Sequence, residues 1–312
     1  MSALIDVILP VFLVLGFGYL AARTALLTEP AIDALMRFAQ NIAAPLLLFV
    51  SIARLDLGSA YDTGLMLSFY TGAFAGFALC FAGARWVFHR PLTDAVAIGF
   101  AGMFSNTLLL GLPITERAYG AQALAGNYAI ISVHAPILYG FGITLMEWAR
   151  TRGHGLPLVH LTRQTLRAIF SQPLVLGILA GFAVNLTGNP LPQVVWAAVG
   201  MIASTAIPLA LFGLGGVLVR YRIEGDLGPA IMVTCAALVV HPAITWALGR
   251  YAFGLNDAGL RSAVVTAAMA PGVNAYIFAN IYGVGKRVSA SAVLVATVAS
   301  IITVWGWLHV LP

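Results

Sequence analysis

The sequence predicts an all-α membrane protein with ten transmembrane helices in two inverted five-helix repeats. Three observations lead to this fold class: an apolar composition, ten successive apolar segments, and short motifs that recur at one fixed spacing. Of the 312 residues, 61% are hydrophobic and only 9% are charged, with a mean hydropathy of +0.95. A soluble domain carries about 25% charged residues to cover its surface. The outer surface of this chain must therefore face lipid, which excludes a soluble enzyme.

Ten apolar segments are long enough to be read as membrane spans, each close to the roughly 20 residues that cross the hydrocarbon core. They divide the chain into a first repeat (1–149), a cytoplasmic basic loop (150–170) and a second repeat (171–312). The predicted spans are 3–22, 34–53, 64–88, 94–119, 123–148, 171–188, 193–219, 228–250, 261–282 and 289–309.

The basic residues of the loops predict the orientation of these spans. Eleven lie in odd-numbered loops and four in even-numbered loops. Because cytoplasmic loops are rich in lysine and arginine, both termini are expected on the extracytoplasmic side of the cell (inner) membrane. The same loops account for the net charge of +5, so no nucleic-acid partner is expected. The eleven are Arg23, Arg85, Arg90, Arg150, Arg152, Arg163, Arg167, Arg220, Arg222, Lys286 and Arg287; the four are Arg54, Arg117, Arg250 and Arg261.

Two short motifs recur in equivalent spans of the two halves. Pro45 opens Pro-Leu-Leu-Leu-Phe in the second span, and Pro208 opens Pro-Leu-Ala-Leu-Phe in the seventh. Tyr119 and Tyr282, each followed by glycine, end the fourth and ninth spans; both pairs lie 163 positions apart. Each half contains an odd number of spans, so the second half starts on the opposite side and the repeats are inverted. Inverted repeats are typical of secondary transporters and favour alternating access.

Proline and glycine interrupt the fourth and ninth spans. Both residues disturb a regular helix, and a helix that restarts within the bilayer exposes N–H groups and the positive end of its dipole. Two such ends suit a carboxylate, with neighbouring amide and hydroxyl groups as further donors. The alternative is an ordinary proline kink repaired by Ser or Thr. The candidate substrate-binding residues are Ser105, Asn106, Thr107, Gly111, Pro113, Pro271, Gly272, Asn274 and Tyr276.

At these motifs the chain resembles the auxin efflux carrier family, which includes bacterial organic-anion carriers. The likeness is carried by Asn-Thr-Leu-Leu-Leu-Gly-Leu-Pro at 106–113, Ala-Pro-Gly at 270–272 and Pro-Leu-Leu-Leu-Phe at 45–49. It covers nearly the whole chain. The long central hydrophilic loop of many plant members is missing here.

The resemblance implies a scaffold domain and a transport domain that work by an elevator-like mechanism, and a homodimer through the scaffold helices. It also implies that helices four and nine cross at Pro113 and Pro271, with the substrate beside the crossing. Asn106 would face the substrate, and the region around Pro45 would form the scaffold wall of the site.

His134 is the most central ionisable residue of the predicted spans. An imidazole titrates near neutral pH, so His134 is a candidate proton carrier, with a neutral packing role as the alternative. Sodium coupling through backbone carbonyls also stays open, although no acidic residue lies near the two interrupted segments.

Catalytic and nucleotide-binding motifs are missing from the sequence. We therefore expect no enzyme, no cofactor and no metal centre. The leading hypothesis is a secondary transporter, surrounded by membrane lipid, that moves a small organic anion (a carboxylate). The alternatives are a channel or a ligand sensor on the same fold, and a membrane-embedded enzyme acting on lipid.

Overall fold

Apart from one β-bridge, all regular structure is helical in the residues that the computed structural model describes: 3–151, 162–163, 166–167, 169–188, 191–223 and 227–312. Within these ranges, seven helices are long and apolar enough to cross a membrane. This confirms an all-α, multi-pass membrane protein, while the count of ten and the inverted repeats stay predictions. Most of the predicted loop 150–170 lies outside the described residues. The seven helices are Leu4–Arg23, Glu29–Ala53, Thr63–Val87, Ala121–Thr151, Gln193–Leu218, Leu227–Ala252 and Lys286–Val310.

The other three predicted spans are short or divided. The sixth is the apolar helix α10 (Pro173–Thr187). The fourth consists of α6 (Leu92–Met103) and α7 (Leu112–Tyr119). The ninth consists of α15 (Asp257–Ala267) and α16 (Val273–Tyr282). The two segments that the sequence marks as interrupted are therefore the two divided ones.

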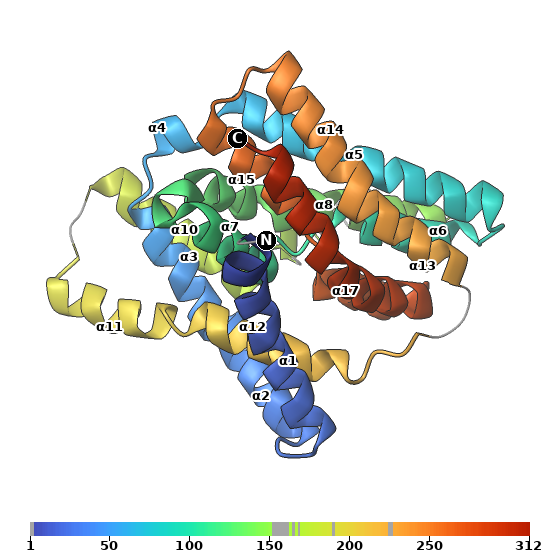
Figure 1. The fold of residues 1–312 in the computed structure, drawn as a ribbon, viewed down its shortest axis with the longest axis horizontal. Helices are drawn as coiled ribbons and strands as arrows, with labels where there is room; N and C mark the ends of the chain where they lie inside the picture. The colour runs from blue at the N-terminus through green and yellow to red at the C-terminus, as the bar shows by residue number, and fades with distance from the viewer. Residues whose placement is uncertain (1–2, 152–161, 164–165, 168, 189–190, 224–226) are drawn as a thin grey trace.

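One set of helices is organised by two close pairs, α1 with α12 and α3 with α10. The helix α2 packs on α12, and α11 packs on α3, so these six form a connected unit that we call the α1 group (Figure 1). Its members are α1 (Leu9–Arg23), α2 (Glu29–Phe38), α3 (Ala44–Ala53), α10, α11 (Gln193–Ala203) and α12 (Ala206–Leu218).

Glycines bring the paired helices of the α1 group into backbone contact. A Cβ added at Gly18 of α1 would meet the backbone of Phe212 in α12, and one added at Gly215 would meet the backbone of Leu15. In a bilayer, where apolar burial gives no advantage over lipid, helices associate largely through such close packing. These small residues therefore stabilise the α1 group.

The remaining long helices form a second unit around the two divided spans, which we call the crossing group. In Figure 1, α5, α13, α14 and α17 lie together on the side away from α1, α2 and α12. The group consists of α5 (Thr63–Ala82), α6, α7, α8 (Ala125–Thr151), α13 (Leu227–Cys235), α14 (His241–Ala247), α15, α16 and α17 (Lys286–Val310). The short helix α4 (Leu57–Ala60) precedes α5 and contacts α8. The two groups touch where α3 and α10 meet α8, and where α12 meets the segment before α7.

Three prolines explain local widening of the helices. Pro45, Pro113 and Pro242 are each the second residue after a five-residue π-type turn. Proline lacks an N–H and its ring clashes with the carbonyl four residues back, so the preceding turn widens instead of continuing as a regular α-helix. The three turns are Ala39–Ala43 (η2), Thr107–Gly111 (η4) and Ala236–Val240 (η6). Similar wide turns are Ala3–Ile8 (η1), Gly83–Val87 (η3) and Leu248–Ala252 (η7), and Ala121–Leu124 (η5) is a 3₁₀ turn.

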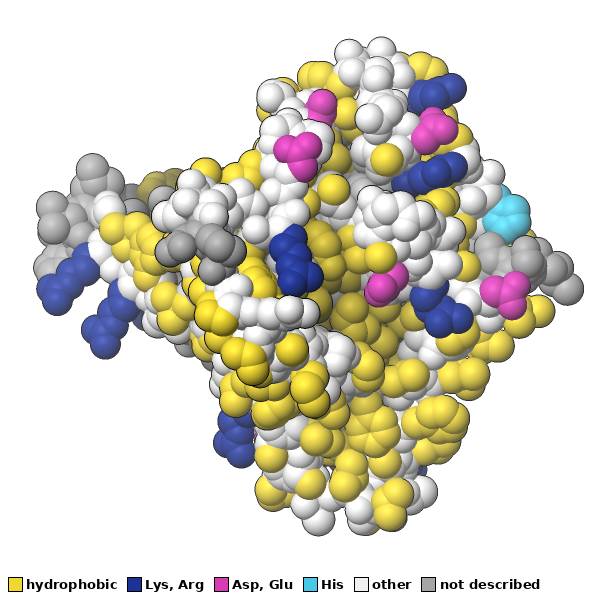
Figure 2. Space-filling model, turned by 90° about the vertical axis from the view of Figure 1, so that its left-hand side faces the viewer, with side chains coloured by type: hydrophobic (Ala, Val, Ile, Leu, Met, Phe, Trp, Pro, Cys, Tyr) yellow, Lys and Arg dark blue, Asp and Glu magenta, His cyan; other side chains and the backbone are white. Residues whose placement is uncertain are grey.

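The outer surface suits lipid. Figure 2 shows a face whose lower part is largely covered by hydrophobic side chains, while most of the visible charged side chains lie in its upper part and at its left edge. Large apolar side chains of the α1 group are strongly exposed, including Phe17 at 60% and Met201 at 74%. A contiguous surface of this kind is typical of a membrane-embedded protein.

Candidate functional site

The two divided spans cross each other through their non-helical segments. Ser105 and Pro271 form an antiparallel β-bridge. The Asn106 N–H donates to the Ala270 carbonyl at 2.8 Å, and the Gly272 N–H donates to the Phe104 carbonyl at 2.9 Å. Irregular backbone is tolerated inside a membrane only where its polar groups are satisfied by protein or water. Each break therefore provides hydrogen-bond partners for the other.

The predicted crossing at Pro113 and Pro271 is correct for Pro271 and wrong for Pro113. The first break lies at Phe104–Asn106, and Pro113 lies within the restarted helix, where the wide turn Thr107–Gly111 accommodates it and the helix continues as α7. The residue opposite Pro271 is Ser105. Asn106 caps the restarted helix, because its side-chain oxygen accepts a hydrogen bond from the Leu109 N–H at 3.2 Å.

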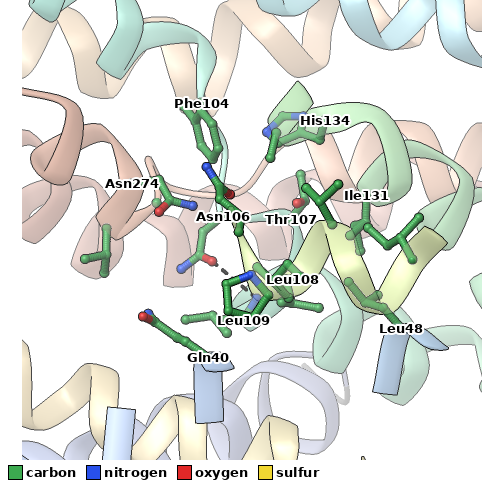
Figure 3. A pocket seen from close by; sticks show the side chains of 18 of the residues that line it. Gln40, Leu48, Phe104, Asn106, Thr107, Leu108, Leu109, Ile131, His134 and Asn274 are labelled. Atoms are coloured by element: carbon green, nitrogen blue, oxygen red, sulfur yellow. Dashed lines mark hydrogen bonds between the residues drawn. The ribbon is translucent and has the colours of Figure 1, made fainter. Parts of the chain in front are cut away.

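A cavity of about 210 Å³ lies beside the crossing, between the two helix groups. Figure 3 shows Asn106, Thr107 and Asn274 from the crossing around it, with Gln40 from the η2 turn between α2 and α3, and His134 from α8. Its polar lining residues are Gln40, Asn41, Ser105, Asn106, Thr107, His134, Gln172 and Asn274; apolar side chains such as Leu48, Phe104 and Ile131 complete it.

Five predicted substrate-binding residues line this cavity: Ser105, Asn106, Thr107, Gly272 and Asn274. The predicted proton carrier, His134, lines it as well.

Four further candidates lie outside the cavity lining. Pro271 is in the crossing itself, and Gly111 packs near the Asn106 carbonyl. Pro113 is buried in α7, and the Tyr276 ring packs against Tyr221 with centroids 4.9 Å apart.

Pro45 also lies outside the lining, but its helix contributes to the cavity. Its backbone is in close contact with Gly177 of α10, while Leu48 of the same helix lines the cavity. That the region around Pro45 forms the scaffold wall of the site remains a proposal, and the position of Leu48 supports it.

Sequence reasoning missed three of the polar residues that line the cavity: Gln40, Asn41 and Gln172. The signal was available for the first two, because they are consecutive amides within an apolar segment, about one turn before Pro45. Gln172 immediately precedes α10, and only the packing of α10 on α3 brings it to the cavity.

The cavity combines an apolar lining with several polar side chains, and it is almost without charge. Among the described residues that line it there is no Asp, Glu, Lys or Arg. The start of α16 lacks a side-chain cap, so the first N–H groups of that helix, at Val273 and Asn274, have no acceptor within the helix. Together with the side-chain amides, these groups make the site rich in hydrogen-bond donors. Among the described residues, no cluster of His, Cys, Asp and Glu is suited to a metal ion.

Comparison with known proteins identifies the family of this chain. The family described as "Membrane transport protein" matches residues 3–308. The chain belongs to this family. The match spans both helix groups and the crossing, and it confirms the resemblance to the auxin efflux carriers.

Relatives of this membrane transport protein are similar over nearly their full lengths. "Putative malonate transporter" of Rhizobium meliloti is 24% identical, covering 100% of this chain and 97% of the relative. "Uncharacterized transporter YfdV" of Escherichia coli is 24% identical, covering 97% and 96%. "Probable auxin efflux carrier component 5b" of Oryza sativa subsp. japonica is 24% identical, covering 94% and 92%. All three are named as transporters or carriers, so the family is one of transport proteins and not of enzymes.

Proposed function

We propose that this chain is a secondary transporter that moves a small organic anion, a carboxylate, across the cell (inner) membrane by alternating access. The observation that carries the proposal is the donor-rich cavity beside two crossing helix breaks, at the boundary of two helix groups. Membership of a membrane transport family supports it, and one relative carries malonate in its name.

Asn106 is the central residue of the proposed binding site. Its side-chain oxygen is engaged by the Leu109 N–H, so its NH₂ group is left to donate toward the cavity. Asn274 supplies a second amide, and the start of α16 supplies backbone N–H groups. Hydrogen bonds from these donors to a carboxylate hold the anion without a permanent positive charge.

The mechanism we propose is an elevator-like movement of the crossing group against the α1 group. The cavity has walls from both groups, so a relative displacement would carry the crossing and its bound anion past Gln40 and Gln172. In this scheme the α1 group is the scaffold, two copies of which form a homodimer, and both termini are extracytoplasmic. A proton or sodium gradient supplies the driving force.

The decisive experiment replaces Asn106 by alanine in full-length protein reconstituted into liposomes. A hydrogen bond to a charged group contributes about 1.5 to 3 kcal/mol, so binding of a transported carboxylate should weaken by about 10- to 100-fold. The matched control is Asn280→Ala, because Asn280 is exposed at the end of α16. Normal carboxylate flux by the Asn106 variant would refute the site.

Counterflow distinguishes a carrier from the alternative functions. A carrier preloaded with unlabelled carboxylate should accumulate labelled carboxylate transiently, because each turnover exchanges one bound anion for another. A channel on the same fold would equilibrate the label without an overshoot, and a sensor would bind the anion without moving it.

A further inference from the structure

His134 is the only ionisable side chain among the described residues that line the cavity. It is 2% exposed, and neither ring nitrogen makes a hydrogen bond of good geometry with a described residue, although the backbone of Ser105 at the crossing approaches the ring. Buried polar groups in proteins are nearly always paired, so an unpaired imidazole at the edge of a binding cavity calls for an explanation. A ligand that hydrogen-bonds to the ring provides one.

The surroundings of the ring are aromatic. Phe69 and Phe104 pack edge-on against it, with centroids 5.6 and 4.8 Å away. The titratable groups near it are Tyr70, with ring centroids 6.2 Å apart, and His241, which packs against the same Phe69 ring.

None of these titratable neighbours carries a negative charge that would hold a proton on His134. The Tyr70 hydroxyl donates to the Ile130 carbonyl, and the His241 ring is hydrogen-bonded to the Phe69 carbonyl at 3.1 Å. On α8 itself, Tyr139 lies one turn beyond and packs against Phe104.

More distant charges do not alter this arrangement. Glu147 is the nearest acidic residue along α8, and thirteen residues of helix place it about 20 Å away. Arg37 lies one turn before Asn41 on α2, at the α1-group side of the cavity, and does not line it.

Charge balance links this ring to the anion. A carboxylate that enters a buried, uncharged site loses its hydration. Hydrogen bonds from the site offset only part of this free energy of desolvation. An opposite charge within a few ångströms favours the ionised form of both partners. The described residues that line the empty cavity include no anionic group to pair with an imidazolium, so the proton arrives with the anion.

Resting on the function proposed above, we infer that the site takes up one net negative charge together with one proton, held by His134. The bound state is then R–COO⁻ beside an imidazolium, which adds no net charge to the membrane interior. The substrate class is a monocarboxylate, or a dicarboxylate in its singly ionised form. A dianion would leave one charge without compensation. Because the positive charge that balances the bound anion is a proton on His134, the inference is of coupling to protons and not to sodium ions.

Isothermal titration calorimetry of the purified full-length protein tests the inference. Propionate and malonate are suitable probes, because malonate replaces the methyl group of propionate by a second carboxylate. Titrations in two buffers of different ionisation enthalpy measure the number of protons taken up per bound ligand. We expect about one proton per propionate, and a Kd that rises about tenfold per pH unit between pH 6.5 and 8.5. Malonate should bind at least about tenfold more weakly than propionate at pH 8.5.

Two histidine variants test whether His134 itself takes up the proton. His134→Gln should abolish proton uptake and leave less than about a twofold change of Kd per pH unit, because its amide hydrogen-bonds without titrating. His241→Gln, the matched buried histidine outside the cavity lining, should retain the proton uptake and pH dependence of the unmodified protein.

The possible failures are distinguishable. Propionate binding without proton uptake by the unmodified protein, or proton uptake retained by His134→Gln, overturns the inference alone. If the unmodified protein binds neither probe, and no carboxylate shows counterflow, the proposed function fails and the inference fails with it. If His134→Gln is not monodisperse, His134→Asn is titrated in its place, because its amide likewise hydrogen-bonds without titrating; the same loss of proton uptake is expected, and retained uptake overturns the inference.

Discussion

Replacing Gly18 by alanine should weaken the contact between α1 and α12. A Cβ at this position would lie 2.7 Å from the carbonyl carbon of Phe212 and 3.0 Å from its Cα, and closer still to its carbonyl oxygen. Carbon atoms in van der Waals contact are about 3.5 to 4.0 Å apart. The obstacle is backbone and not the end of a flexible side chain, so the two helices must separate by about 1 Å to reach that distance.

The fall in the free energy of unfolding can be worked out from the side-chain contacts that this separation weakens. Leu15 and Leu214 are both buried in the same apolar cluster between these helices. A buried leucine makes about 40 to 60 heavy-atom contacts of about 0.1 to 0.2 kcal/mol each, and a gap of about 0.5 to 1 Å forfeits at least a quarter of that energy. The loss is about 2 kcal/mol for each leucine. With partial relaxation, the free energy of unfolding should fall by about 3 kcal/mol.

Gly16 supplies a matched control on the same helix. A Cβ at Gly16 meets nothing within 4 Å, so Gly16→Ala should change the free energy of unfolding by no more than about 0.5 kcal/mol. The two variants would be compared by unfolding in mixed micelles with increasing SDS, followed by tryptophan fluorescence. Equal stability of the two alanine variants would show that α1 and α12 do not pack at this distance.

Three further predictions concern the crossing group and the orientation. Asn127→Ala should lower the free energy of unfolding by about 2 kcal/mol, because the buried amide donates to two threonine hydroxyls at 3.0 and 2.7 Å; an unchanged melting temperature would contradict this. Phe278→Ala should cost about 3 to 5 kcal/mol in the same SDS assay, since its buried ring stacks on Phe100 at 3.9 Å. In a cysteine-free background, Ser59→Cys should react with an impermeant maleimide in intact cells, and Lys286→Cys only after permeabilisation; the opposite pattern would invert the topology.

The interrupted spans show how far sequence reasoning reached within the site. Proline and glycine correctly marked the fourth and ninth spans as divided. They did not locate the first break, because Pro113 is accommodated by the wide turn before it and the helix continues through it. The break lies instead where Asn106 caps the restarted helix, a role that any Asn or Ser nearby could have filled.

The residues of the cavity wall show where that reasoning ended. Asn106 and Asn274 were found because each lies close to a break along the chain. Gln40 lies in the η2 turn between α2 and α3, and Gln172 immediately precedes α10. Only the packing of these segments against the crossing group brings both amides to the cavity.

Composition alone determined that this chain lies in a membrane, because too few charged residues exist to cover a water-exposed surface. The order of apolar segments and breaker residues determined which two spans are divided. Only the tertiary structure decided that Ser105 meets Pro271, and that His134 is the one ionisable group at the cavity among the described residues. These facts depend on backbone hydrogen bonds and helix packing between segments far apart in the chain, which local residue preferences do not specify.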